Sequence, residues 1–307
     1  MKSFKIKIFL AFYTSVIVLL FVRQYTSASS YSLGIYPPII KIKAVLPAKI
    51  KSELKIKNLS DYPVNLRFVI KPFVANENNT NQVKYLLYAD YTTANTNFLQ
   101  KVKILENDQS VSKITLAPKQ EKKLMLMIDL PKEEKPIDHY FSLVFLAQNQ
   151  DKLNSSYSQI LGGIAMNVLV SIDPQGYKAL IADFSTSSLV SQGPIKFNVK
   201  IKNIGDHFIT TNGYILIKNI FGQTVGKVDL GPRNILAKST SQILNNPAVW
   251  SEKFLLGSYT AKLYLTYDNS SNLFGETKFI AIPTKIIIIL TIVGLIAIFI
   301  IKQSKNR

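Results

Sequence analysis

The sequence predicts an all-β protein of two tandem antiparallel β-sandwiches, followed by one C-terminal transmembrane helix. Three observations predict the sandwiches. Short runs alternate between apolar and polar residues, as strands with one buried face do, and β-branched and aromatic residues are abundant. Residues 55–61 also recur in similar form at residues 200–206, each time between two alternating runs. Asn and Asp in both copies favour a chain corner, because their side chains bond nearby backbone amides. This shared context predicts two copies of one immunoglobulin-like unit.

The strands fall into two groups along the chain. The clearest alternating runs are residues 64–70, 124–130 and 164–172 in the first group, and 195–202 and 259–267 in the second. Turn residues separate these runs, which is the pattern of an antiparallel sandwich. The turn-forming residues 173–176 mark the boundary. We therefore expect the first immunoglobulin-like domain over residues 31–173 and the second over residues 177–282.

Several aromatic residues are candidate partner contacts. Residues 75–110 have no counterpart in the second copy, begin with several asparagines and contain Tyr85, Tyr88 and Tyr91. We expect them to form an excursion from the first sandwich. Trp250 is the only tryptophan and has two interpretations. It packs between the sheets or at one end of the second sandwich, or it is a hot spot for a partner.

The N-terminal end has the order of a secretory signal peptide. Three lysines precede an apolar run over residues 8–22, and small polar residues follow. We place the signal peptide at residues 1–28, with cleavage after Ala28. The alternative is an uncleaved anchor, but the apolar run is short for a span of roughly 20 residues.

The C-terminal end predicts a membrane anchor. Lys285 and Lys302 bracket an apolar run from Ile286 to Ile301, and both lysines can extend their ammonium groups to the interfaces. The run itself covers roughly 24 Å at about 1.5 Å per residue. A buried core helix is the alternative, although the run has no polar face. The basic residues 303–307 orient this end toward the cytoplasm.

Other anchoring signals do not fit this end. A lipid-anchor signal would end in its hydrophobic tail instead of a basic hexapeptide. A sortase signal needs Leu-Pro-x-Thr-Gly before the helix, and residues 282–285 lack its glycine and spacer. The chain contains no cysteine, so lipoprotein acylation and disulfide bonds are both excluded.

The net charge of +18 is concentrated at the ends of the chain. Eight of the 37 basic residues lie there without acids, which leaves 29 basic against 19 acidic residues, or +10, for the body. This charge favours anionic polymers. The alternative is a solvated strand face, because lysines alternate with apolar residues, as at 196–202. Nucleic acid is not an expected partner of a body outside the cell.

The sequence offers few groups for catalysis or metal binding. Without cysteine, cysteine–histidine catalysis and most zinc sites are excluded, and only His139 or His207 can supply the histidine of a serine–histidine–acid triad. Each follows an aspartate, and adjacent side chains of a strand point to opposite faces. No phosphate loop, calcium loop or carboxylate pair with catalytic spacing is evident. We expect no enzyme activity, no cofactor and no metal.

Dispersed motifs resemble bacterial surface proteins. They lie at residues 32–38, 55–58, 114–120, 136–141 and 161–165 of the first domain, and at residues 213–217, 221–222, 250 and 256–261 of the second. Together with the signal, the anchor and the basic tail, they resemble the WxL-interacting proteins of Gram-positive bacteria and their uncharacterised relatives. The resemblance implies attachment to peptidoglycan through the first domain and to a partner protein through the second.

We therefore expect a non-enzymatic binding or scaffolding protein of the cell surface, held by a single membrane pass. Its body, beginning with the mature N-terminus, would lie outside, and its C-terminal tail in the cytoplasm. The expected partners are the membrane, peptidoglycan or an anionic wall polymer, and another surface protein. The alternative is an extracytoplasmic chaperone for surface or pilus subunits that acts by β-strand addition, because pilus chaperones also have two tandem immunoglobulin-like domains. A hydrolase would depend on one of the two histidines.

Overall fold

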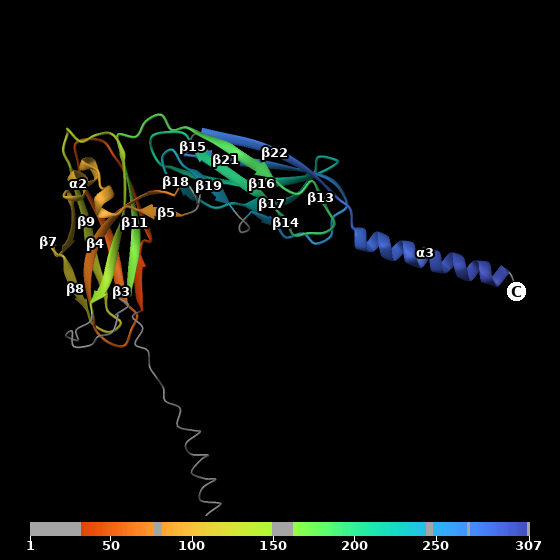
Figure 1. Cartoon of the computed structure of the whole chain (residues 1–307), viewed down its shortest axis with the longest axis horizontal. Helices are drawn as coiled ribbons and strands as arrows, with labels where there is room; N and C mark the ends of the chain where they lie inside the picture. Colours follow the sequence, from red (N-terminus) through yellow and green to blue (C-terminus); the bar gives the residue numbers. More distant parts are fainter. Residues whose placement is uncertain (1–31, 77–81, 149–161, 244–247, 269–270, 306–307) are drawn as a thin grey trace, which may run out of the picture.

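A computed structural model describes residues 32–76, 82–148, 162–243, 248–268 and 271–305 (Figure 1). The expected signal peptide and its cleavage at Ala28 lie outside the described residues. The described chain consists mainly of strands arranged as two β-sandwiches, with a long helix at the C-terminal end. The predicted fold class is confirmed.

The first sandwich packs two sheets around an apolar core. In spatial order, one sheet consists of β1 (Leu33–Tyr36), β3 (Ala48–Asn58), β9 (Glu121–Leu130), β6 (Val102–Glu106) and β7 (Gln109–Ser110). The other sheet consists of β2 (Ile39–Ala44), β11 (Gly163–Ile172), β10 (Asp138–Gln148), β4 (Val64–Ala75) and β5 (Val83–Tyr85), and β8 (Lys113–Leu116) also pairs with β4. The apolar faces read from the sequence meet in the core, where Leu66, Leu126 and Val168 are fully buried.

The second sandwich has its own core. One sheet consists of β12 (Ala179–Ser185), β15 (Asn198–Asn203) and β19 (Thr240–Ile243). The other consists of β13 (Leu189–Val190), β22 (Ser271–Ala281), β21 (Gly257–Tyr267), β16 (Ile209–Asn219) and β17 (Thr224–Asp229), and β18 (Arg233–Ile235) pairs with β16. A short pair joins β14 (Ile195–Lys196) to β20 (Val249–Trp250). Ala261 and Leu263 point inward, as the alternation predicts.

Residues 75–110 are only in part an excursion. Within them, residues 83–99 contain β5, a short 3₁₀ helix η1 (Tyr88–Asp90) and the helix α2 (Thr93–Leu99). Phe98 of α2 is buried in the first core, and β6 is an integral strand paired with β9. The sequence did not predict this, because α2 and β6 are too short to show a clear period.

The recurring sequence forms the same corner twice. Asn58 is fully buried; its side-chain nitrogen donates to the carbonyl oxygens of Tyr62 and Ala117, and its side-chain oxygen accepts from the amide of Ser60. Asn203 is equally buried and bonds in the same pattern, donating to the carbonyl oxygens of His207, Ile235 and Leu236 and accepting from the amide of Gly205. Each asparagine therefore satisfies a chain reversal that would otherwise bury unpaired backbone groups.

The second sandwich stands end-on against the outer face of the β2-containing sheet of the first (Figure 1). Outward-facing residues of a sheet are normally solvated. Here Leu169 and Ser171 of β11 are 3% and 0% exposed, although Val168 and Val170 point into the first core. The second sandwich covers this face and thus buries both sides of β11.

A saturated carboxylate lies at the centre of this junction. Asp138 begins β10, and its side chain is 3% exposed. One carboxylate oxygen accepts from Ser171 Oγ (2.6 Å) and His207 Nδ1 (2.7 Å), and the other accepts from Tyr140 Oη (2.5 Å) and the amide of Phe208 (2.5 Å). Because an ionised carboxylate only accepts, the His207 Nδ1 atom carries the proton. Two of the four donors come from each sandwich.

Apolar and charged contacts surround this carboxylate. Phe73 and Leu169 of the first sandwich pack with Phe208 of the second, and all three are at most 3% exposed. The hydroxyl of Tyr140 also accepts from the amide of Ala237 across the junction (3.1 Å). Burial, followed by the charge of Asp138, raises the pKa of Tyr140, which keeps this hydroxyl protonated as a donor.

A second polar contact joins the sandwiches at the β2 edge. The Lys43 ammonium bonds Asp268 (2.5 Å) and lies 4.4 Å from the centre of the Tyr177 ring. The neighbouring Lys41 donates to Thr210 Oγ1 (3.3 Å). The two lysines flank the buried Ile42 in β2. Their ammonium groups contact residues of the second sandwich as well as solvent.

The C-terminal helix α3 (Thr284–Lys305) begins directly after Pro283. It has 22 residues, or roughly 33 Å at about 1.5 Å per residue, which exceeds the hydrocarbon core of a bilayer. The helix extends beyond the apolar run by Thr284 and Lys285 at its start and by Lys302 to Lys305 at its end, whereas residues 279–282 belong to or follow β22. Among the described residues, α3 is the one helix long and apolar enough to cross a membrane, and none of it is buried.

We predict that Asp138→Ala destabilises the full chain by about 3–5 kcal/mol, because it leaves buried donors from both sandwiches without an acceptor. Urea unfolding in detergent micelles, followed by intrinsic fluorescence, measures this. Asp206→Ala is the matched control, because its side chain is 81% exposed and beside the same histidine. The two variants shifting the unfolding midpoint equally would contradict the role of Asp138.

Candidate functional site

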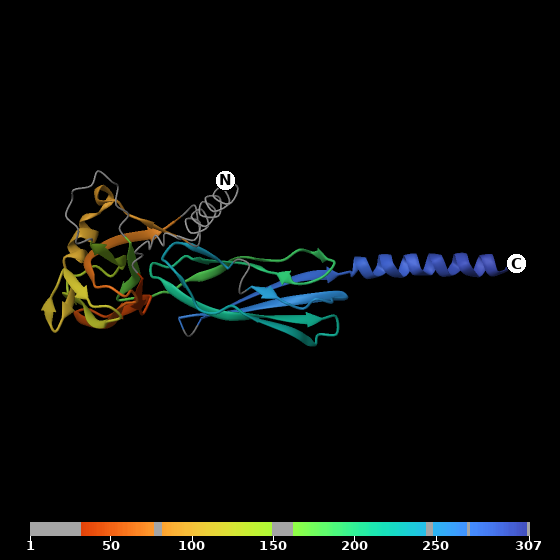
Figure 2. The same cartoon turned by 90° about the horizontal axis from the view of Figure 1, so that it is seen from below.

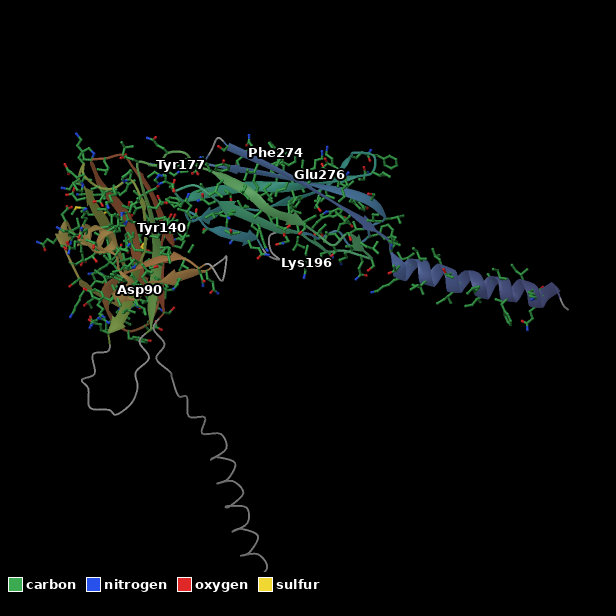
Figure 3. The ribbon with its side chains drawn as sticks, turned by 45° about the horizontal axis from the view of Figure 1, so that its top comes forward. Asp90, Tyr140, Tyr177, Lys196, Phe274 and Glu276 are labelled. Carbon is green, nitrogen blue, oxygen red and sulfur yellow. The ribbon has the colours of Figure 1, made fainter. Side chains whose placement is uncertain are left out.

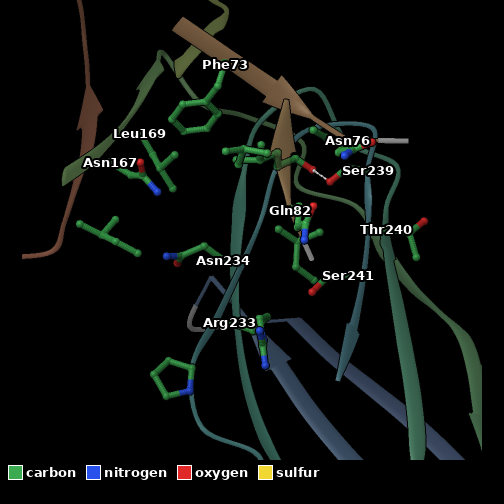
Figure 4. A pocket seen from close by; sticks show the side chains of 16 residues that line it. Phe73, Asn76, Gln82, Asn167, Leu169, Arg233, Asn234, Ser239, Thr240 and Ser241 are labelled. Carbon is green, nitrogen blue, oxygen red and sulfur yellow. Dashed lines mark hydrogen bonds between the residues drawn. The ribbon is translucent and has the colours of Figure 1, made fainter. Parts of the chain in front are cut away.

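A pocket lies in the angle between the two sandwiches (Figure 4). Its volume is about 330 Å³, near the lower end of the range for ligand pockets. Both sandwiches contribute to its walls, so it exists only because the junction holds them together. We call it the junction pocket.

The first sandwich supplies one wall from β2, β11 and the β4–β5 hairpin. Ala75 and Val83 pair across this hairpin, and the amide of Asn76 donates to the carbonyl of Gln82 to extend it (3.2 Å). Asn167 and Leu169 come from β11. The hairpin thus carries two amide side chains to the pocket beyond the edge of its own sheet.

The second sandwich supplies the other wall from β18, β19 and their connection. Arg233, Asn234 and Leu236 lie on or after β18, and Ser239, Thr240 and Ser241 lead into β19. Asn234 is oriented by Thr210, whose hydroxyl donates to its side-chain oxygen (2.9 Å). Ser239 Oγ donates to the carbonyl of Leu236 (2.9 Å), which closes the connection.

The lining combines apolar surface with neutral polar groups. Apolar contributions come from Ile39, Phe73, Val83, Leu169, Pro232 and Leu236. Amides and hydroxyls supply both donors and acceptors. Arg233 is the one charged residue in this lining as far as the structure describes it. This composition suits an uncharged, amide-rich ligand with apolar substituents.

A second candidate surface is the open edge of β22 (Figure 3). This strand pairs with β21 along its whole length, whereas only Ile280 and Ala281 pair with β13. The amides of Ile280 and Ile282 donate toward β13. Because backbone groups alternate sides along a strand, those of residues 272, 274, 276 and 278 point to the same side. No strand in the described part of the chain pairs with them.

The aromatic candidates divide into exposed and packed residues. Tyr88 is 85% exposed, and its ring lies 5.4 Å from that of the partly buried Tyr91. Tyr85 packs edge-on to Phe73, and its hydroxyl lies 3.0 Å from Ser142 Oγ. Among these tyrosine candidates, the Tyr88–Tyr91 pair therefore presents aromatic surface without an evident structural use.

Trp250 takes the packing role and not the partner-contact role. It is 7% exposed within the second core, and its ring lies edge-on to Tyr259 at 5.7 Å. A Cβ atom on Gly226 would lie 2.4 Å from the Trp250 Nε1 atom. The close backbone of β17 therefore covers the indole and removes it from any partner.

The two histidines have different structural roles. Ser171, His207 and Asp138 come together, but serine and aspartate both contact His207 Nδ1. In a catalytic triad they occupy opposite ring nitrogens, so this cluster has the geometry of a structural junction. The sequence did not predict this cluster, because Asp138 and His207 lie in different domains.

His139 is buried in the first sandwich. It is 4% exposed and stacks on Phe98, with ring centroids 3.8 Å apart and planes 6° apart. Its Nε2 atom has no hydrogen-bond partner among the described residues. Burial lowers the pKa of His139 to about 4, so the ring is neutral near pH 7 and serves packing.

The described residues contain no cluster of three or more His, Asp or Glu side chains that could hold a metal ion. The acidic residues instead pair with lysines at scattered points, including Glu106 with Lys122 (2.7 Å) and Lys101 with Glu134.

No protein-family model matches the sequence, and no curated protein matches it. Solved structures of similar architecture include the class 5 fimbriae chaperone CfaA, at 13% identity over 81% of this chain and 99% of that chain, with a TM-score of 0.37. The E. coli chaperone DraB is 13% identical over 82% of this chain and 96% of that chain, with a TM-score of 0.38. A chain from a complex of Salmonella enterica SafA pilin with the SafB chaperone is 8% identical over 83% of this chain and 98% of that chain, with a TM-score of 0.38. These likenesses give this chain neither a client nor an activity.

We predict that the stability of the chain falls as the pH is lowered from about 6.5 to about 4. In this window the unfolded chain protonates His139 and the folded chain does not, which costs the folded state roughly 3 kcal/mol over the whole window. Urea unfolding at pH 7 and pH 4.5 measures the loss. His139→Phe should retain the stacking and show a smaller loss; an unchanged pH dependence in this variant would refute the assignment.

Proposed function

We propose that this chain is a membrane-tethered, non-enzymatic protein that holds an extended segment of another surface protein in the junction pocket. The observation that carries the proposal is the pocket itself: both sandwiches line it, and a buried carboxylate network fixes them in place. A preformed site loses little entropy on binding.

The chemistry of the lining favours a polypeptide. A peptide backbone offers alternating donors and acceptors, and the amide side chains of Gln82, Asn167 and Asn234 carry both kinds of group. The apolar residues of the lining, including Phe73 and Leu169, suit one or two apolar side chains of the partner. A volume of about 330 Å³ lies near the lower end of the range for ligand pockets, which suits a short segment.

An anionic wall polymer fits the pocket less well. Recognition of a polyanion needs several cations along its path, and the described lining has only Arg233. Lysines are numerous elsewhere, but many are paired with acids on strand faces. We therefore treat binding to a wall polymer as one alternative that the Arg233→Ala experiment below distinguishes.

A second candidate is a chaperone that accepts a client strand along β22. The open backbone groups at residues 272–278 can pair with an extended chain. Beside this edge, the half-buried side chains of Ile181 and Phe184 approach Gly275, at 3.2 and 3.3 Å from the position of an added Cβ atom. A client strand would bring further apolar side chains to this open side of the sandwich.

The first test uses Arg233→Ala in the full chain. We expect capture of the partner to weaken roughly 10- to 100-fold, because a hydrogen bond from a charged group contributes about 1.5–3 kcal/mol. The measurement is cross-linking from intact membranes followed by identification of captured proteins, with titration of the purified partner. Lys238→Ala is the matched control, because Lys238 follows the same strand but pairs with Asp206 outside the pocket.

Two outcomes would contradict the pocket proposal. Capture that is equally strong in Arg233→Ala and Lys238→Ala would place binding elsewhere. Retention of the protein by purified cell wall at physiological salt, lost in Arg233→Ala, would identify a wall polymer as the ligand.

The second test separates strand addition from pocket binding. Glu276→Pro removes an outward amide of β22 and spares the hydrogen bonds to β21, whereas Glu276→Ala removes only the side chain. Loss of client capture in the proline variant alone would support strand addition. Equal capture by both variants would exclude the β22 edge.

A further inference from the structure

The end of the second sandwich nearest α3 presents an apolar surface. Ile220 and Phe221 occupy the β16–β17 turn and are 73% and 82% exposed. Phe254 and Leu256 precede β21 and are 58% and 63% exposed. We call these four residues the tip. Clustered exposed aromatic and aliphatic side chains of this size mark an interaction surface.

The strand register places the tip beside the start of the helix. Asn219, next to Ile220, pairs with Tyr259, and Gly257, next to Leu256, pairs with Ala281. Helix α3 begins at Thr284, directly after this strand end. In Figure 2, α3 continues from this end along the long axis of the second sandwich.

The backbone holds the tip residues outward. Asn219 Oδ1 accepts from the amides of Phe221 and Gln223, both at 3.0 Å, and Gly222 adopts a φ of 78°, which closes the turn. In the other loop, Leu255 is 1% exposed and anchors the chain between its two exposed neighbours. The exposed side chains of the two loops are not used for packing. Their exposure follows from the backbone conformation of the turn and from the buried Leu255.

A lipid bilayer is the partner that fits this surface. Helix α3 is apolar and unburied, so exposed apolar side chains are present both on the helix and on the tip at its start. Phe and Leu side chains insert at the boundary between headgroups and acyl chains in proteins that lie on a membrane, and lysines extend their ammonium groups to the headgroup region. Lys253 and Lys285 are exposed beside the tip, with Glu252 as the neighbouring acid.

We propose that the tip docks on the membrane interface and holds the second sandwich upright above the bilayer. The inference rests on the tether in the proposed function. It adds that the ectodomain does not swing freely about Pro283. Strand β22 has 11 residues, or roughly 36 Å at about 3.3 Å per residue, so docking sets the height of the junction pocket above the membrane.

The absence of cysteine from the chain permits a direct test. Thr224→Cys carries an environment-sensitive fluorophore beside the tip, Glu276→Cys carries it midway along the sandwich, and Val293→Cys carries it within α3. Each full-chain protein is reconstituted into phosphatidylcholine–phosphatidylglycerol vesicles containing brominated lipids. We expect strong quenching at residue 293, quenching at residue 224 by shallow bromines, and at least threefold less quenching at residue 276.

Substitutions then test the apolar contact. In the Thr224→Cys protein, Ile220→Ser combined with Phe221→Ser should abolish most of the quenching. Phe274→Ser is the matched control, because Phe274 is 68% exposed on the same sandwich but away from the tip. It should leave the quenching unchanged.

The outcomes separate this inference from the tether. Quenching at residue 293 with none at residue 224 would overturn docking and leave the tether intact. No quenching at residue 293 would overturn both. A blue shift at residue 224 without quenching would indicate contact with a second copy of the chain, which would also overturn membrane docking.

Discussion

The carboxylate of Asp138 is the constraint on which the rest of the structure depends. An isolated charge in a protein interior is strongly unfavourable. Asp138 is tolerated because it accepts four hydrogen bonds, and Phe208 and His207 of the second sandwich supply two of them. Separation of the sandwiches would expose the apolar cluster around Phe208 and remove half of the donors. The junction therefore has one strongly preferred geometry.

That geometry creates the features that carry the proposed function. The junction pocket has walls from both sandwiches, so its shape follows from their fixed angle. The end-on arrangement places the first sandwich at one end of the second and α3 at the other (Figure 1). The molecule thus has the form of a head on a stalk. A rigid stalk holds the pocket at a defined distance from α3, which a flexible linker would not do.

The candidate site itself was largely beyond the reach of the sequence. Arg233, Asn234 and Gln82 have no motif or spacing that distinguishes them from other polar loop residues. The aromatic residues gave a stronger signal, but Trp250 is covered by the close approach of Gly226 and its strand. The acid that contacts His207 is Asp138, 69 residues away in sequence, whereas the adjacent Asp206 pairs with Lys238.

By itself, the sequence determined the elements that depend on local pattern. Alternation specified the strand faces, the repeated Asn58 and Asn203 specified two equivalent corners, and the run before Lys302 specified an apolar helix. These features depend on the spacing of residues within one segment. Only the tertiary structure decided that Leu169 and Ser171 are buried and that the pocket exists. The reason is physical: contacts between two folded surfaces leave no period in either sequence, because each surface is built from strands distant in the chain.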